Sequence, residues 1–237
     1  MLAFLQASAE PALHAALWSA LTIGVYLGAK RLHRRWPRRW LMPLAVAPAV
    51  VGAAVLALHV SYRDYIGGTR WLVLMLGPAT VAFAIPIYQQ RALIARHWPV
   101  LLVGMVAGSL VSIGTSWLLA KWVGLDEALR LSLLPRSVTT PFAMEVSGEI
   151  GGVPDLTAVF VVVTGITGAL LGDLILARVP IASALARGAL FGIGAHGAGT
   201  ARAQQIGGRE GAVAGLVMVL VGLMNLALAP LLALAVR

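Results

Sequence analysis

The chain has 237 residues, of which 59% are hydrophobic and 11% charged, and its net charge is +9. A soluble domain of this length needs a far more polar surface. The basic residues lie in short loops between apolar runs and form no stripe interleaved with aromatic residues, which argues against nucleic-acid binding. The absence of cysteine excludes disulfides and thiolate chemistry.

Apolar runs of membrane-spanning length recur along the chain. A helix needs roughly 20 apolar residues to cross the hydrocarbon. The third run is short and is interrupted at Gly77-Pro78 and Pro86. We predict an all-α, polytopic membrane protein forming one transmembrane domain over residues 1–237. Six full spans are expected, over about 12–29, 41–60, 71–87, 99–120, 155–177 and 211–235.

Basic residues alternate between the predicted loops. The loops over 62–70 and 121–130 mix charges, whereas the loop after the third span holds Arg91, Arg96 and His97. The positive-inside rule places basic loops in the cytoplasm, so both termini should face the periplasm of a bacterial inner membrane. The strongest basic cluster follows the first span, and we expect it to fix orientation rather than to bind a ligand. It comprises Lys30, Arg31, Arg34, Arg35, Arg38 and Arg39.

Two segments in the second half of the chain should be broken or re-entrant. The first, 131–152, is interrupted at 135–141, where Thr140 is the expected N-cap and Pro141 follows it. The second, 188–208, contains a glycine-rich run over 192–200 that should not hold a helix. Thr200 could then cap a short helix ending at Gly207-Gly208.

The two broken segments resemble an internal repeat. Residues 149–152 align with 205–208 at an offset of 56, and the following apolar spans then coincide. Inverted repeats with broken helices are typical of transporters, including elevator-like ones. Only three residues of the alignment are identical, so coincidence is the alternative.

The broken segments are the predicted site. Irregular backbone at membrane depth should line protein or a water-filled cavity, and a half-helix N-terminus suits an anion. The alternative is two ordinary kinks with caps. The predicted substrate-binding residues are Ser137, Thr139, Thr140, His196, Thr200 and Arg202.

Other polar residues are weaker candidates. Glu145 would carry a coupling proton, since an ionisable side chain at membrane depth indicates function; the alternative is an interfacial glutamate near a helix end. Arg136, Thr80 and Asn225 are secondary candidates, with snorkelling for Arg136 and helix–helix contact for Asn225 as alternatives. No enzyme, metal or cofactor motif is found, and none is predicted.

Several motifs together resemble the LrgB/CidB family, over about residues 67–235. Arg136 and Arg202 stand where a lysine is expected in the family, and both keep the charge. The motifs are Leu76-Gly77-Pro78-Ala79-Thr80-Val81-Ala82, Pro135-Arg136-Ser137-Val138-Thr139-Thr140-Pro141 with Ala143-Met144-Glu145, Gly151-Gly152-Val153-Pro154 with Leu156-Thr157-Ala158-Val159-Phe160, and Ala195-His196-Gly197-Ala198-Gly199-Thr200-Ala201 with Glu210-Gly211-Ala212.

The resemblance implies two functions. Family members are described as antiholin-like or as controlling murein hydrolase export, and plant and bacterial relatives are linked to glycolate, glycerate or pyruvate transport. We expect a secondary transporter of such small monocarboxylates, with proton coupling through Glu145. The alternative is an antiholin-like regulator of murein hydrolase export that acts as a membrane oligomer. The expected partners are the lipid bilayer, a second copy of the chain in a dimer, and a small LrgA-like membrane protein.

Overall fold

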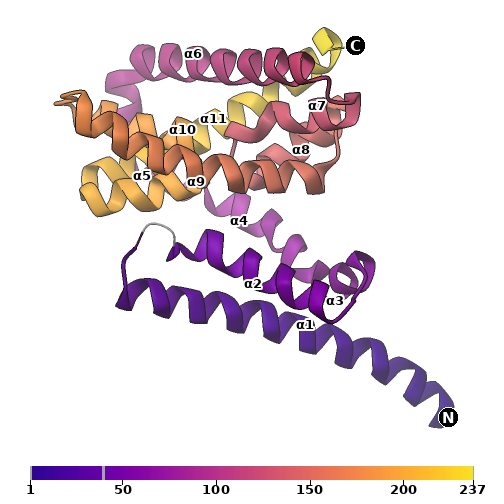
Figure 1. Ribbon diagram of the computed structural model, residues 1–237. Coiled ribbons are helices and arrows are strands. Elements are labelled where there is room, and N and C mark those ends of the chain that lie inside the picture. Colours follow the sequence, from indigo (N-terminus) through magenta and orange to yellow (C-terminus); the bar gives the residue numbers. More distant parts are fainter. Residues whose placement is uncertain (1, 39–40, 237) are drawn as a thin grey trace. The chain divides into compact units, whose positions relative to one another are not determined.

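The computed structural model describes residues 2–38 and 41–236, so Arg39 of the basic cluster lies outside it. Every element in this part of the chain is a helix, as predicted. The chain forms two compact units, Met1–Ala79 and Thr80–Arg237 (Figure 1). The single transmembrane domain stays a prediction.

The first unit is built around its longest helix. It comprises α1 (Leu2–Arg35), α2 (Pro43–Ala57), α3 (Tyr62–Leu74) and the start of α4 (Leu76–Ala82). Helix α1 packs against both α2 and α3. Ser19 of α1 donates a hydrogen bond to the carbonyl of Gly68 at 3.0 Å and accepts one from the indole of Trp71 at 2.8 Å. These buried bonds hold α3 in place along α1.

The predicted loop over 62–70 is wrong, because these residues form most of α3. The hydroxyl of Ser61 accepts a hydrogen bond from the backbone N–H of Asp64 at 3.2 Å and so caps the helix. The predicted interruptions are present but displaced. Pro78 and Pro86 each lie in the first turn of a short helix, α4 and α5 (Ala84–Gln89), where a missing N–H is tolerated.

Four stretches of the described chain are long and apolar enough to cross a membrane, which confirms a polytopic membrane protein. Six full spans were expected. Helix α1 is not among the four, and α2 has 15 residues, about 22 Å at 1.5 Å per residue, against a hydrocarbon core of about 30 Å. The four are Tyr62–Gln89, Arg91–Val123, Pro154–Arg178 and Gly208–Ala235.

The second unit is a bundle in which α10 packs between α9 and α11, and α6 lies along the bundle (Figure 1). Its core is formed by side chains such as Leu134, Phe191 and Leu216, all fully buried. Glycines with positive φ end two helices, Gly124 after α6 and Gly151 after α8. The elements are α5, α6 (Arg91–Val123), α7 (Glu127–Leu133), the 3-10 helix η2 (Leu134–Ser137), α8 (Thr140–Ile150), α9 (Pro154–Arg178), α10 (Ala184–Ile206) and α11 (Gly208–Val236).

Candidate functional site

The first broken segment is a helical hairpin made of α7, η2 and α8. Its two ends lie together, because the backbone N–H of Val153 donates to the hydroxyl of Ser132 at 2.7 Å. Gly151, at the end of α8, lies against Leu131. The turn between the helices spans residues 134–139. A chain that returns to its starting side has the shape that a re-entrant segment requires.

A group of buried hydroxyls closes this first hairpin. The Thr157 hydroxyl lies 2.7 Å from that of Ser147 and 2.9 Å from the carbonyl of Ser132. All three residues are fully buried. Buried polar groups need partners. The Ser132 hydroxyl finds its partners in the backbone, because it donates to the carbonyl of Ala128 and accepts from the N–H of Val153. Sequence reasoning missed these residues, although hydroxyls flanking a predicted re-entrant turn were a usable signal.

The N-cap of α8 is Thr139, not Thr140 as predicted. Thr139 has extended backbone angles, φ −61° and ψ 142°, whereas Thr140 is the first helical residue and Pro141 follows it. The proline favours the start of a helix but does not fix which threonine precedes it. No side-chain bond from Thr139 caps the helix. The helix ends at Gly151, whose φ is 91°.

The second broken segment, α10, is also a helical hairpin, and its break is confined to one residue. His196 has φ 35° and ψ −115°, inside an otherwise helical run. Gly199 lies so close to Phe191 that a Cβ on it would be 2.1 Å from the Phe191 carbonyl oxygen. In a straight helix residues eight apart are about 12 Å apart, so α10 doubles back at His196. The prediction that the whole run over 192–200 is non-helical is therefore wrong.

The ends of α10 are joined as well. Arg187, near its start, donates hydrogen bonds to Glu210, in the first turn of α11, from Nε at 3.1 Å and also from Nη2. Glu210 follows the end of α10 by four residues. The halves, 184–195 and 197–206, would be about 18 and 15 Å long. Each is close to half the thickness of the hydrocarbon core.

The strained residue at this turn is a histidine although glycines stand beside it. A positive φ favours glycine. The turn nevertheless does not lie at Gly194 or Gly197, which are close to His196 in the sequence. The His196 side chain is 3% exposed, and its Nε2 is buried without a hydrogen-bond partner. A strained backbone that carries an unsatisfied polar group indicates a functional site.

Glycines of α9 make room for the turn. A Cβ on Gly165 would be 2.9 Å from the His196 ring, and one on Gly168 would be 2.2 Å from the carbonyl oxygen of Gly194. Gly172 lies against Phe191 in the same way. Sequence reasoning missed this contact surface, whose signal is the spacing of 165, 168 and 172 along one helix face.

The tips of the two hairpins meet. The 3-10 helix η2 packs against α10. The backbone carbonyl and the charge of Arg136, in η2, both act on His196. Arg136 is half-buried and donates from Nε to the hydroxyl of Ser116 at 2.7 Å. No carboxylate pairs with it in the part of the chain that the structure describes. The half-buried cation of Arg136 therefore lies near the buried imidazole of His196, whose Nε2 has no hydrogen-bond partner.

Two predicted anion-binding residues are engaged elsewhere. Arg202 donates to a carboxylate oxygen of Asp173 at 2.7 Å and to the side chain of Gln205 at 3.0 Å. Thr200 lies inside the second half of α10 rather than at its start, so it is not the predicted cap, and its hydroxyl is 3.8 Å from the sulfur of Met218. Of the two candidate arginines, Arg136 is therefore the one without a carboxylate partner among the described residues, although the sequence ranked it below Arg202.

The remaining candidates are spread more widely. Ser137 and Thr139 belong to the first tip, whereas Glu145 is exposed on α8. Asn225 donates to the Ser109 hydroxyl at 2.9 Å, so it joins α11 to α6. Thr80 is half-buried in α4. No group of three metal-ligating side chains occurs within the residues that the structure describes.

Comparison with known proteins shows the family of the chain. The LrgB-like family matches residues 22–234. The chain belongs to this family. Among its LrgB-like relatives, "Uncharacterized protein YwbG" of Bacillus subtilis is 42% identical over 212 residues, 90% of this chain and 94% of the relative. "Holin-like protein CidB" of Staphylococcus aureus is 30% identical over 218 residues, 92% and 95% of the two chains. No solved structure matches the chain.

Proposed function

We propose that this LrgB-like protein is a secondary transporter of small monocarboxylates and that the two hairpin tips form its substrate site. One observation carries the proposal: Arg136, without a carboxylate partner, and the unpartnered Nε2 of His196 lie together where the tips meet. A substrate carboxylate would supply the negative partner that Arg136 lacks, and it would accept a hydrogen bond from the imidazole. Glycolate, glycerate and pyruvate are the substrates to test first.

The energetics favour an anion over an empty structural turn. A buried charge costs several kcal/mol in lost hydration unless it is paired. A carboxylate entering the site loses hydration too, and the guanidinium, the imidazole and the second half-helix N-terminus replace it. Each charge-assisted hydrogen bond contributes roughly 1.5–3 kcal/mol.

A holin-like or antiholin-like role in the control of murein hydrolase export is the second candidate. The name of the staphylococcal relatives, holin-like protein CidB, supports it, and the comparisons support it better than they support organic-acid transport. Action as a membrane oligomer would not require a buried histidine at a strained turn. The geometry of the tips therefore favours transport, whereas the names of relatives favour the second candidate.

The proposal also includes the location of the protein, its partners and its proton coupling. The protein would lie in the bacterial inner membrane as a dimer, alongside a small LrgA-like membrane protein. Glu145 would carry the coupling proton. No catalytic role is assigned, since transport requires no covalent chemistry by the chain.

Uptake into liposomes separates the two functions. The purified protein is reconstituted, and uptake of labelled glycolate, glycerate and pyruvate is measured against leakage of a trapped neutral dye. We expect saturable uptake without leakage. Arg136→Gln should raise the half-saturating concentration roughly ten- to a hundredfold.

Arg178→Gln, at the end of α9, is the matched control and should leave uptake unchanged. Leakage of the dye with no saturable uptake would favour the holin-like role. Normal uptake by a well-folded Arg136→Gln protein would place the substrate site elsewhere.

A further inference from the structure

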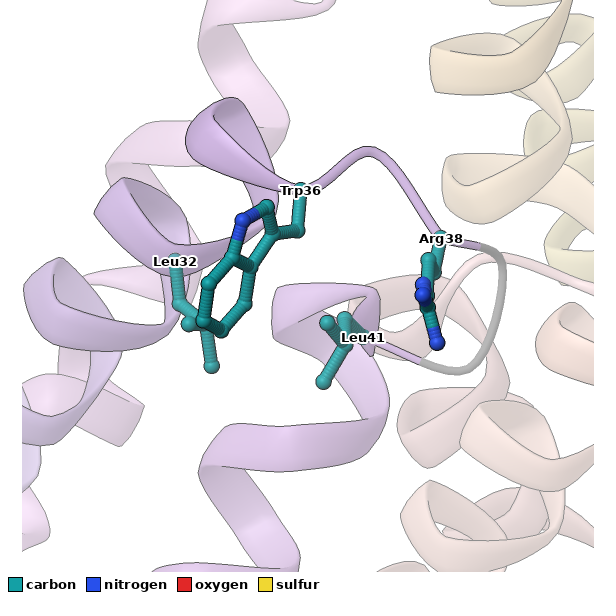
Figure 2. Close-up of a pocket in the computed structure, with 4 residues that line it drawn as sticks. All are labelled: Leu32, Trp36, Arg38 and Leu41. Atoms are coloured by element: carbon teal, nitrogen blue, oxygen red, sulfur yellow. The ribbon is translucent and has the colours of Figure 1, made fainter.

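A second feature lies in the first unit, where α1 ends and α2 begins. A cavity of about 260 Å³ is lined by Leu32 of α1 and by Trp36, Arg38 and Leu41, which follow the end of that helix (Figure 2). Leu41 is an apolar lining residue that is 8% exposed, whereas Trp36 is 56% exposed. The cavity therefore combines an apolar surface with one guanidinium.

Several basic residues lie near this cavity at the end of α1. His33, Arg34 and Arg35 form the last turn of α1, and the exposed Lys30 and Arg31 precede them. One or two cations would balance the negative C-terminal end of a helix dipole. The larger number creates a positive surface beside the cavity.

The surroundings of the cavity point to a membrane boundary. Farther up α1, Leu13, Leu17 and Leu27 are exposed by 61%, 59% and 49%. Such a surface suits hydrocarbon, and it gives way to basic residues and a tryptophan at the end of the helix. Tryptophan and basic side chains are typical of the headgroup region.

We propose that this cavity binds the headgroup of an anionic phospholipid. The phosphate contacts Arg38 and the neighbouring arginines of α1, and the upper acyl chain covers Leu32, Leu41 and the Trp36 ring. Clusters of four to eight basic residues at a membrane surface attract acidic lipids. The site is independent of the hairpin tips and of the transport proposal.

Native mass spectrometry of the full-length protein tests the proposal. Phosphatidylglycerol and phosphatidylcholine are titrated in detergent, and soluble glycerol phosphate is titrated separately. We expect phosphatidylglycerol to bind more tightly than either of the others. Arg38→Gln should weaken its binding about fivefold, the effect of one basic residue near an anionic surface. Arg63→Gln, an exposed arginine on α3, should not change it.

Three outcomes would overturn the proposal. They are equal binding of the two lipids, glycerol phosphate binding as tightly as phosphatidylglycerol, and an equal loss in the Arg63→Gln control. If Arg38→Gln fails to fold, Trp36→Leu is the variant to test, because it keeps every charge and removes the indole ring that lines the cavity. Undiminished phosphatidylglycerol binding by folded Trp36→Leu would also reject the site.

Discussion

The two hairpins of the second unit share a shape but differ at their centres. The first hairpin is closed by Ser132, Ser147 and Thr157, whose hydroxyls satisfy one another and the backbone. The second turns at His196, whose Nε2 has no partner and whose backbone is strained. The buried hydroxyls of the first hairpin thus all have hydrogen-bond partners, whereas the buried imidazole of the second hairpin has one nitrogen without a partner. If the protein is the transporter proposed above, ligand contact would be concentrated at the second tip, and the first tip would contribute Arg136.

The largest expected effect tests how tightly the second hairpin is held. Gly168→Ala places a Cβ 2.2 Å from the carbonyl oxygen of Gly194, a backbone atom that cannot turn aside. Overpacking of this kind costs up to about 3 kcal/mol. Thermal unfolding in detergent should show a clear loss of stability. Gly104→Ala on α6 meets no atom within 4 Å and is the control; equal unfolding temperatures would contradict the close contact.

The next prediction tests the closure of the first hairpin. Thr157→Val removes a buried hydroxyl and leaves its partners unsatisfied, at a cost of about 2 kcal/mol. Thr157→Ser should keep most of the stability. Thr167→Val is the control on the same helix, because the exposed Thr167 bonds only to carbonyls of its own helix. A Thr157→Val protein as stable as wild type would show that the hydroxyl group is dispensable.

A smaller effect separates strain from function at the second tip. His196→Gly should be about 1 kcal/mol more stable than His196→Ala, because glycine accepts a positive φ and relieves strain of roughly 1–3 kcal/mol. Both variants should bind carboxylates more weakly than wild type. At the first tip Thr139, with φ −61°, offers no such relief, so Thr139→Gly should not be stabilising relative to Thr139→Ala. Unfolding midpoints of the four proteins decide the matter, and equal His196 variants would argue against strain.

The smallest expected effect on stability is that of Glu145→Gln. Glu145 is exposed on α8 and forms no side-chain hydrogen bond or ion pair with the residues that the structure describes, so the unfolding temperature should not change measurably. If Glu145 carries the coupling proton, uptake by the variant should lose its dependence on pH. Comparing uptake by this variant with carboxylate binding by the His196 variants tests whether proton coupling depends on the first hairpin and substrate binding on the second. Unaltered pH dependence would remove Glu145 from the mechanism.

The sequence predicted the helical fold and the two broken segments, because apolar run length and glycine and proline placement are local signals. It placed the second break too broadly, since glycine content does not show that one residue, His196, takes the whole turn. It favoured Arg202 over Arg136, because pairing with Asp173 is a tertiary contact between residues 29 apart. The hydroxyl group around Thr157 was missed for the same reason. The sequence therefore indicated which polar side chains could form a site, but not which tertiary hydrogen bonds and ion pairs they make.

The bond between Arg187 and Glu210 has a mechanical consequence. Together with the covalent link through Gly207, it makes α10 and the start of α11 a closed ring whose far point is His196. A closed ring resists bending, so the tip cannot swing open like a flap while the ion pair holds. The second hairpin would then travel as a rigid body, and access to His196 would change only when its neighbours slide past it.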